Sequence, residues 1–95
     1  MAIYNPMSED QTSKFYYVYI LLCSDGQLYT GCSGNLKDRY SRHQRGEVFS
    51  TKDKRPLKLL WCCAFPDRTF AFAFEKYLKS GSGRAFARKR LIEIK

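Results

Sequence analysis

The sequence contains little that could build a metal cluster or a redox centre. Its 95 residues include 4 cysteines and 1 histidine, His43. No two cysteines have the C-x-x-C spacing, and Cys62 and Cys63 are adjacent, so they would point to opposite faces of a strand. This spacing argues against a zinc site. We interpret the cysteines as small buried hydrophobic residues in a reducing compartment.

Acidic residues and long apolar segments are scarce as well. The chain carries 17 Lys and Arg against 9 Asp and Glu, a formal net charge of +8. Such an excess indicates a polyanionic partner, most often a nucleic acid, with an anionic membrane surface as the competing partner. No stretch is long enough to span a bilayer, and the N-terminus lacks the basic and apolar segments of a signal peptide. We therefore expect a cytoplasmic protein that is not inserted in a membrane.

The length and the local patterns predict one small domain. Residues 1–14 are polar and have no sustained period, so we expect a flexible N-terminal tail there. Residues 15–95 would form the domain. Their apolar patterns and breakers predict the element order β-β-α-β-α-α.

Two tyrosine-rich strands joined by a tight turn are the centre of this prediction. Residues 16–22 are aromatic, β-branched and aliphatic, and residues 27–32 form the return strand. Between them, Ser24-Asp25-Gly26 suits a three-residue loop, in which a type I turn is followed by Gly26 as a left-handed G1 bulge.

The turn decides which side chains share a face of the hairpin. The three-residue loop pairs Leu21 with Tyr29 and Tyr19 with Gly31. Tyr17, Tyr19 and Tyr29 then lie on one face. The ring of Tyr19 can cross the backbone of Gly31, which has no side chain. Tyrosines are ordinary strand residues, but two phenols side by side on a rigid hairpin also suit a prepared site.

A helix and a strand follow the hairpin. The helix covers residues 36–45, between the N-cap Asn35 and Gly46 at its C-terminal end. The strand covers residues 57–65, and its largely apolar composition predicts a central or well-covered position.

Two more helices complete the predicted order. Residues 70–74 alternate like a strand, but the apolar residues up to Leu78 fit a helical period, so we predict a helix that begins near Asp67. Residues 80–83 break it, and a last helix spans residues 84–94. Phe70, Phe74, Tyr77 and Leu78 fit the spacing of the first of these two helices, and Phe86, Ala87, Leu91 and Ile94 would face inward in the last.

Polar residues that could carry chemistry follow at helical spacings. Arg39 and His43 are four residues apart and meet at the border of the buried face of their helix. Glu75 lies among apolar residues, which predicts either an ion pair with Lys79 or a metal ligand. Residues 47–54 combine hydroxyls and cations without an apolar period, as a phosphate-contacting loop or a solvated connector would.

This ordered set resembles the GIY-YIG nuclease domain. The resemblance rests on Tyr17-Val18-Tyr19, Tyr29-Thr30-Gly31, Arg39, His43 and Glu75, and it extends over about residues 15–91. The chain looks most like the small stand-alone bacterial type, and it is similar to the N-terminal domain of the incision subunit of nucleotide-excision DNA repair. The resemblance implies an α+β fold, a three-stranded antiparallel sheet flanked by helices, which agrees with the predicted order.

The resemblance also implies a metal-dependent DNA endonuclease that hydrolyses phosphodiester bonds. Glu75 would bind Mg²⁺ or Mn²⁺, Arg39 would hold the scissile phosphate, and Tyr19 would act as general base toward water. Tyr29 would position water or phosphate, and His43 would assist. An unperturbed tyrosine has a pKa near ~10, so such a base needs nearby cations. The residues expected to contact DNA are Arg42, Thr51, Lys52, Lys54, Arg55, Lys79, Arg84 and Arg88.

Two departures from the family pattern leave other functions open. Many members have a lysine directly after the last glycine of the motif, where this chain has Cys32. Many also have an asparagine downstream of the metal-binding glutamate, which this chain lacks. The alternatives are a catalytically weak or inactive nucleic-acid-binding module, and a structural subunit that depends on a partner. For the nuclease itself, the short chain leaves room for a protein partner that supplies specificity for DNA.

Overall fold

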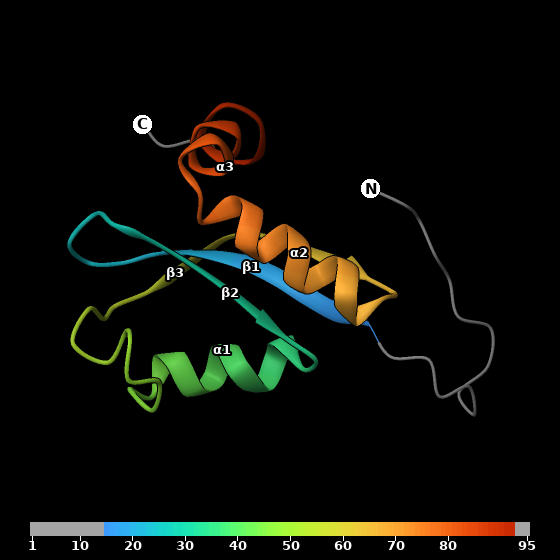
Figure 1. Cartoon of the computed structure of the whole chain (residues 1–95). Coiled ribbons are helices and arrows are strands. Elements are labelled where there is room, and N and C mark those ends of the chain that lie inside the picture. Colours follow the sequence, from blue (N-terminus) through green and yellow to red (C-terminus); the bar gives the residue numbers. More distant parts are fainter. Residues whose placement is uncertain (1–14, 93–95) are drawn as a thin grey trace, which may run out of the picture.

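A three-stranded antiparallel sheet in the order β2-β1-β3 carries helices on both faces (Figure 1). The computed structural model describes residues 15–92. Its elements are β1 (Tyr16–Leu22), β2 (Leu28–Ser33), α1 (Leu36–Gln44), β3 (Lys58–Phe65), α2 (Arg68–Leu78), α3 (Gly81–Phe86) and the π-helical η1 (Ala87–Leu91). α1 covers one face of the sheet, and α2 and η1 cover the other. The predicted α+β class and the predicted order are confirmed.

The β1–β2 hairpin has the predicted three-residue loop. The Cys23 N–H donates to the Gln27 carbonyl and the Gly26 N–H donates to the Cys23 carbonyl, both at 2.9 Å. Gly26 has a φ of +86°, the left-handed conformation that a G1 bulge requires. The resulting register is the predicted one, with Tyr19 opposite Gly31.

Successive side chains of β1 point to opposite faces of the sheet, so they belong to two separate apolar clusters. Val18 and Ile20 point to one face, where Leu78 of α2 packs against them. Tyr19 and Leu21 point to the other face, toward α1. Each of these four strand residues is at most 1% exposed, so β1 is the buried centre of the sheet.

The prediction of a central or well-covered strand at residues 57–65 is wrong. β3 is an edge strand, and none of its residues is fully buried. Its apolar side chains reflect contacts with α2 rather than a central position. The rings of Trp61 and Phe65 lie 6.1 and 5.6 Å from the ring of Phe74, measured between centroids.

The two longer helices begin at the predicted caps. The Asn35 side chain accepts a hydrogen bond from the Asp38 N–H at 3.0 Å, and α1 ends just before Gly46, which has a φ of +77°. The Asp67 side chain accepts a hydrogen bond from the Thr69 N–H at 2.8 Å at the start of α2.

The fully buried residues of α2 are aliphatic. The helix includes the alternating residues 70–74, as predicted. However, Phe70 and Tyr77 are 65% and 41% exposed, whereas Ala71 and Leu78 are buried. The small side chain of Ala71 faces the sheet, so the rings on either side of it turn outward.

The last helical segment begins earlier than predicted. α3 starts at Gly81 rather than at residue 84, because the Ser80 hydroxyl accepts a hydrogen bond from the Gly83 N–H at 3.1 Å and caps the helix. A Cβ at Gly83 would collide with the carbonyl oxygen of Tyr77, so a glycine permits this close packing against α2. The tail at residues 1–14 and the inward role of Ile94 lie outside the described residues.

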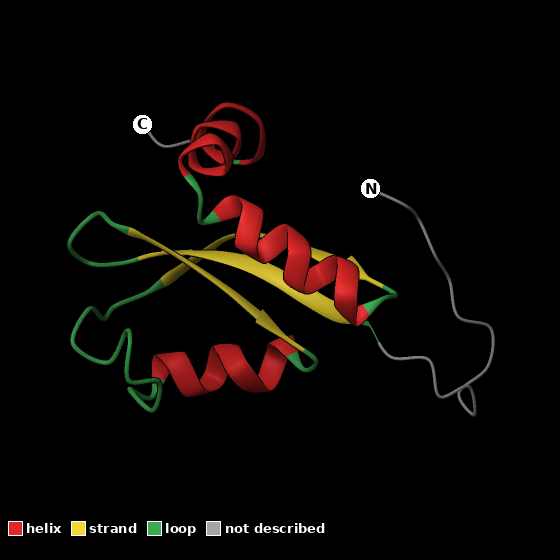
Figure 2. Cartoon of the chain, in the orientation of Figure 1, coloured by secondary structure: helices red, strands yellow, loops and turns green. Residues whose placement is uncertain are grey.

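The loop between α1 and β3 lies at the same end of the sheet as the hairpin turn (Figure 2). The Ser24 N–H donates to the Lys54 carbonyl at 2.9 Å, and the Lys54 ammonium donates to Gln27 Oε1 at 3.3 Å. Hydrogen bonds thus fix this loop to the hairpin. Among the described residues, no helix has the length and the apolar composition that crossing a membrane requires.

Candidate active site

The centre of β1 places the phenol of Tyr19 over the backbone of β2. Its partner in the sheet is Gly31, and the ring lies against that glycine. A Cβ built at Gly31 would come within 2.5 Å of Tyr19 Cζ, whereas ordinary contacts begin near 3.4 Å. The absence of a side chain at Gly31 therefore provides the space that the ring occupies, as predicted from the sequence. Tyr19 is fully buried.

His43 connects Tyr19 to the loop after α1. It comes from the last turn of α1, and its side chain is fully buried. The Tyr19 hydroxyl lies 2.9 Å from His43 Nε2, and Thr51 Oγ1 lies 2.7 Å from His43 Nδ1. Both ring nitrogens are therefore engaged in a buried hydrogen-bond chain from Thr51 through His43 to Tyr19.

Burial keeps both members of the Tyr19–His43 pair neutral at pH 7. Burial, together with the neighbouring Tyr29, raises the pKa of Tyr19 to about 12, although the Arg39 guanidinium acts to lower it. Burial, followed by the charge of Arg39, lowers the pKa of His43. A phenol with this pKa is ionised in only about one molecule in 10⁵ at pH 7. Tyr19 is thus a poor base by itself. A neutral His43 accepts the phenolic proton in one of its two tautomers and donates to the phenol oxygen in the other.

Tyr29 completes a cluster of three rings, called here the tyrosine–histidine cluster (Tyr19, Tyr29 and His43). The ring centroid of Tyr29 lies 6.4 Å from that of Tyr19 and 5.2 Å from that of His43. Tyr29 is half-buried, whereas the other two side chains are inaccessible. It is therefore the member of the cluster that solvent or a ligand can reach.

Arg39 and Glu75 lie on helices that cover opposite faces of the sheet. Arg39 lies on α1, and Glu75 lies on α2, which covers the other face (Figure 1). Both charges act on the pKa of Tyr19 and on that of Cys32. Both therefore lie within electrostatic range of the middle of β2. Of the five predicted catalytic residues, the structure brings Tyr19, Tyr29 and His43 together on the α1 face, whereas Glu75 lies on the helix of the other face.

The carboxylate of Glu75 is partly covered and already has a partner. Its side chain is 19% exposed, and Oε2 lies 3.0 Å from Lys79 Nζ. The first of the two predicted roles, the ion pair, is therefore present. Within residues 15–92, no group of three or more His, Cys, Asp or Glu side chains could hold a metal. A metal at Glu75 would take its other ligands from water or phosphate.

Cys32 occupies the position at which a lysine is common in GIY-YIG domains. Burial, followed by the charge of Glu75, raises the pKa of its thiol. Three cations act in the opposite direction on this pKa: Arg39, Arg68 and Lys79. Positive charge from α1 and from both ends of α2 thus surrounds the position that lacks the lysine.

The cations predicted to contact DNA fall into two groups. The first lies on α1 and the following loop, and consists of Arg42, Lys52, Lys54 and Arg55. The second lies at and beyond the end of α2, and consists of Lys79, Arg84 and Arg88. In the first group, Asp38 lies 3.6 Å from Arg42, and the Arg55 guanidinium donates to the Lys52 and Gln44 carbonyls.

Thr51 belongs to neither group, and the prediction that it contacts DNA is wrong. The side chain is fully buried, and its hydroxyl bonds to His43. The loop turns it inward, because the Thr51 N–H donates to the Val48 carbonyl and the Thr51 carbonyl accepts from the Lys54 N–H. No local pattern could have signalled the Thr51–His43 bond, since it joins a helix to a non-repetitive loop.

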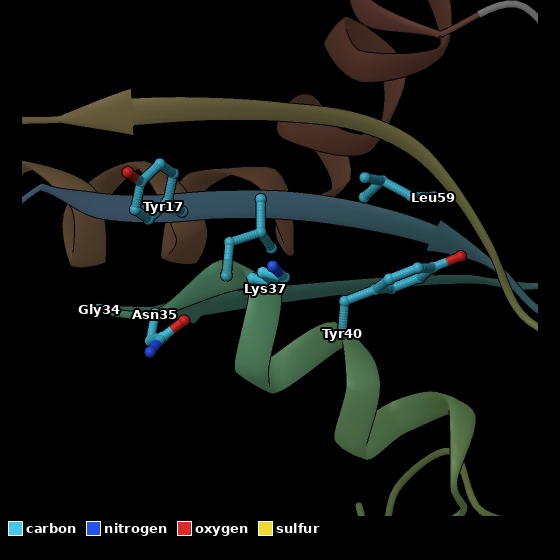
Figure 3. A pocket seen from close by; sticks show the side chains of 7 residues that line it. Tyr17, Gly34, Asn35, Lys37, Tyr40 and Leu59 are labelled. Carbon is cyan, nitrogen blue, oxygen red and sulfur yellow. The ribbon is translucent and has the colours of Figure 1, made fainter.

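A separate cavity of about 460 Å³ lies on the α1 face of the sheet. Figure 3 shows Tyr17 from β1, Lys37 and Tyr40 from α1, and Leu59 from β3 around it. Tyr17 shares a sheet face with Tyr19, as predicted, but it lines this other cavity. No member of the tyrosine–histidine cluster lines it, so we do not assign it to the candidate site.

Comparisons with known proteins show which family this chain belongs to. The GIY-YIG catalytic domain matches residues 15–90. A UPF0213 protein of Limosilactobacillus reuteri is 36% identical over an alignment of 75 residues that covers 76% of this chain and 78% of that protein. A UPF0213 protein of Lacticaseibacillus paracasei is 37% identical over an alignment of 68 residues that covers 70% of this chain and 76% of that protein.

A solved structure agrees with these sequence matches. The solution NMR structure of the UPF0213 protein BH0048 from Bacillus halodurans has a TM-score of 0.53 and 31% identity to this chain. The similarity covers 79% of this chain and 83% of that one. The matched residues 15–90 include all strands and every member of the candidate site. The protein therefore belongs to the family of the GIY-YIG catalytic domain, a family of nucleases.

Proposed function

We propose that this protein is a metal-dependent endonuclease that hydrolyses phosphodiester bonds in DNA. The observation that supports this most strongly is the buried hydrogen bond between Tyr19 and the neutral His43, with Arg39 and Glu75 acting on the same edge strand. The net charge of +8 suits a polyanionic substrate. DNA as the substrate, the metal and the individual roles below are parts of the proposal.

The Tyr19–His43 pair would remove the proton from the attacking water. This role requires the Nδ1–H tautomer of His43, in which the Tyr19 hydroxyl would donate to Nε2 and Nδ1–H would donate to Thr51 Oγ1. When water attacks phosphorus, its proton passes to the Tyr19 oxygen while the phenolic proton passes to Nε2. This transfer avoids a free phenolate, which a pKa of about 12 makes rare. Because Tyr19 is buried, the half-buried Tyr29 would have to move aside to admit the water.

Arg39 would bind the scissile phosphate. A guanidinium can pair with two phosphate oxygens at once, and its charge does not depend on pH in the working range. Its influence on the pKa of both Tyr19 and His43 indicates that it lies beside the proton path. Negative charge that develops on the phosphate would therefore be compensated next to the group that takes the proton.

Glu75 is the residue that would hold Mg²⁺ or Mn²⁺. Mg²⁺ prefers oxygen ligands, keeps several waters and commonly binds through one or two carboxylates and substrate phosphates. A single carboxylate with 19% exposure fits this mode, provided that Lys79 releases it. When bound, the metal would neutralise charge on the phosphate and stabilise the leaving oxygen.

A nicking assay tests this proposal. Supercoiled plasmid and branched DNA are incubated with the wild type, Glu75→Gln and Glu47→Gln in the presence of Mg²⁺ or Mn²⁺. Glu47 is the matched control, because it also pairs with a cation, Arg45 at 2.8 Å, but lies outside the candidate site. We expect nicking by the wild type and Glu47→Gln and a loss of about 10²-fold or more in Glu75→Gln. Wild-type nicking no greater than that of Glu75→Gln would overturn the proposal.

A DNA-binding module without catalysis is the second candidate function. Two observations favour it: Cys32 replaces the common lysine, and the Glu75 carboxylate is already paired with Lys79. This candidate predicts DNA binding that weakens with salt, no cleavage, and no Mn²⁺ binding that depends on Glu75. Calorimetric titration of Mn²⁺ into the wild type and Glu75→Gln separates the two functions.

A further inference from the structure

A pocket of about 500 Å³ lies between the β1–β2 hairpin and the last helical segments. Ile20 and Leu28 line it from the hairpin, and Leu78 and Ala87 line it from the helices. These side chains give the pocket an apolar floor, which is part of the cluster on the α2 face. Its volume lies in the range of about 300–1,000 Å³ that is typical of pockets for small organic ligands.

The rim of this pocket is cationic. Lys79, Arg84 and Arg88 line it, and no acidic side chain among the described residues does. Within the described part of the chain, Arg84 and Arg88 form no ion pair. An apolar floor beside two guanidinium groups suits a ligand that has a flat apolar part and an anionic part.

Two residues of this pocket also belong to the candidate active site. Tyr29 lines the pocket from the edge strand β2, between Leu28 and Thr30, whereas its ring lies on the other face of the sheet, 5.2 Å from that of His43. Lys79 also lines the pocket, and it pairs with Glu75 at 3.0 Å. A DNA strand whose phosphate lies at the candidate site would therefore have its neighbouring nucleotide at the pocket.

We propose that this pocket binds one unpaired nucleotide of the DNA strand, next to the phosphate that is cut. The inference rests on the proposed function and adds a substrate class: DNA with a single-stranded segment at the cut. The base would lie on the apolar floor, and the adjoining phosphate would contact Arg84 and Arg88. Thr30, which also lines the pocket, offers a hydroxyl to the base edge.

A paired base does not suit this site. Within a duplex, each base is stacked on both faces and paired along its edge, so it must leave the helix before it can enter a pocket. For a nucleotide that is already unpaired, near a flap or junction, most of this free energy of unpairing is not required. The pocket would therefore favour DNA that has an unpaired nucleotide at this position.

Two charge-matched double variants test the proposal. Arg84→Gln with Arg88→Gln removes two charges from the pocket. Lys89→Gln with Arg90→Gln removes two charges from η1, at exposed positions that do not line the pocket. Fluorescence anisotropy, without divalent metal, measures binding to a labelled duplex and to the same duplex with a short single-stranded flap.

The wild type should bind the flap DNA more tightly than the duplex by about tenfold, which is the order of affinity expected from the stacking of one base. The pocket variant should lose this preference, and the control variant should keep it. Both should weaken duplex binding to a similar degree, because each lacks two charges. An absent preference in the wild type, or an equal loss of flap affinity in both variants, overturns the inference.

NMR of methyl groups locates the ligand independently of the variants. The dinucleotide pTpT should shift the methyl signals of Leu28 and Leu78, but not that of Leu57 in the other apolar cluster. The same shifts with an acidic peptide and none with pTpT would assign the pocket to a protein partner and overturn the inference. Cleavage without flap preference overturns only the pocket assignment, whereas flap preference without cleavage overturns only the nuclease proposal.

Discussion

Replacing Gly31 by alanine should displace Tyr19 from His43. The new methyl group would lie 2.5 Å from Tyr19 Cζ, compared with about 3.4 Å for an ordinary contact, so the ring must retreat by about 0.9 Å. The Tyr19 hydroxyl already lies 2.9 Å from His43 Nε2. A shift of this size changes the length and angle of that hydrogen bond, because Tyr19 is fully buried and packs within the apolar cluster on the α1 face.

The expected loss of stability is the sum of two effects, overpacking of the buried ring and weakening of its hydrogen bond. Overpacking of a buried site costs about 1–3 kcal/mol, and a lost hydrogen bond costs roughly 1 kcal/mol more. We therefore expect Gly31→Ala to lower the free energy of unfolding by about 2–4 kcal/mol. Gly34→Ala is the matched control, because its Cβ would lie 3.4 Å from Tyr16 Cε1, an acceptable contact. Its free energy of unfolding should stay within about 1 kcal/mol of the wild-type value.

Urea denaturation, followed by the fluorescence of Trp61, measures both values. Trp61 is the only tryptophan, and its ring lies 6.1 Å from that of Phe74, so its emission should report unfolding. The ¹⁵N signals of His43 should shift in Gly31→Ala and remain in place in Gly34→Ala. Equal stabilities of the two variants, with unchanged His43 signals in both, would refute the placement of Tyr19 over Gly31.

Three further predictions concern the Thr51 hydroxyl, the protonation of His43 and the ion pair between Glu75 and Lys79. Thr51→Val removes the acceptor for Nδ1 and should slow DNA cleavage about tenfold or more, whereas Thr51→Ser keeps a hydroxyl and should remain within about threefold of the wild type; equal rates for the two variants would contradict the proton path. Burial lowers the pKa of His43, so below about pH 6.5 the unfolded chain binds a proton that the folded protein does not, and the free energy of unfolding should decrease from pH 7 to pH 5. His43→Gln should flatten this dependence in urea denaturation, and an unchanged slope would speak against a buried neutral histidine. Lys79→Met releases the Glu75 carboxylate from its ion pair and should tighten Mn²⁺ binding severalfold in a calorimetric titration; no metal binding by this variant would argue against Glu75 as a ligand.

The hairpin was predictable from the sequence because its determinants are local. Ser24-Asp25-Gly26 selects the loop type, the loop type selects the register, and the register places Tyr19 opposite Gly31. The helix caps Asn35 and Asp67 are equally local, since each bonds to a backbone N–H two or three residues away.

Other features depended on how the layers pack, which no short pattern encodes. Helical spacing places Glu75 on a helix, but it does not say which face of the sheet that helix covers. The apolar run of β3 fits an edge strand under aromatic rings as well as it fits a central strand. Thr51 lies in a loop without a period, and only its packing against α1 turns the hydroxyl toward His43.

The single-turnover rate of DNA cleavage by Tyr19→Phe tests the central claim most directly. This substitution keeps the ring and removes only the hydroxyl that bonds to His43. Tyr17→Phe is the control, because Tyr17 lies on the same face of β1 but lines a different cavity. With excess protein and Mg²⁺, we predict a rate about 10²-fold or more below the wild-type rate for Tyr19→Phe and a rate near the wild-type value for Tyr17→Phe. Cleavage by Tyr19→Phe at the wild-type rate would contradict the account.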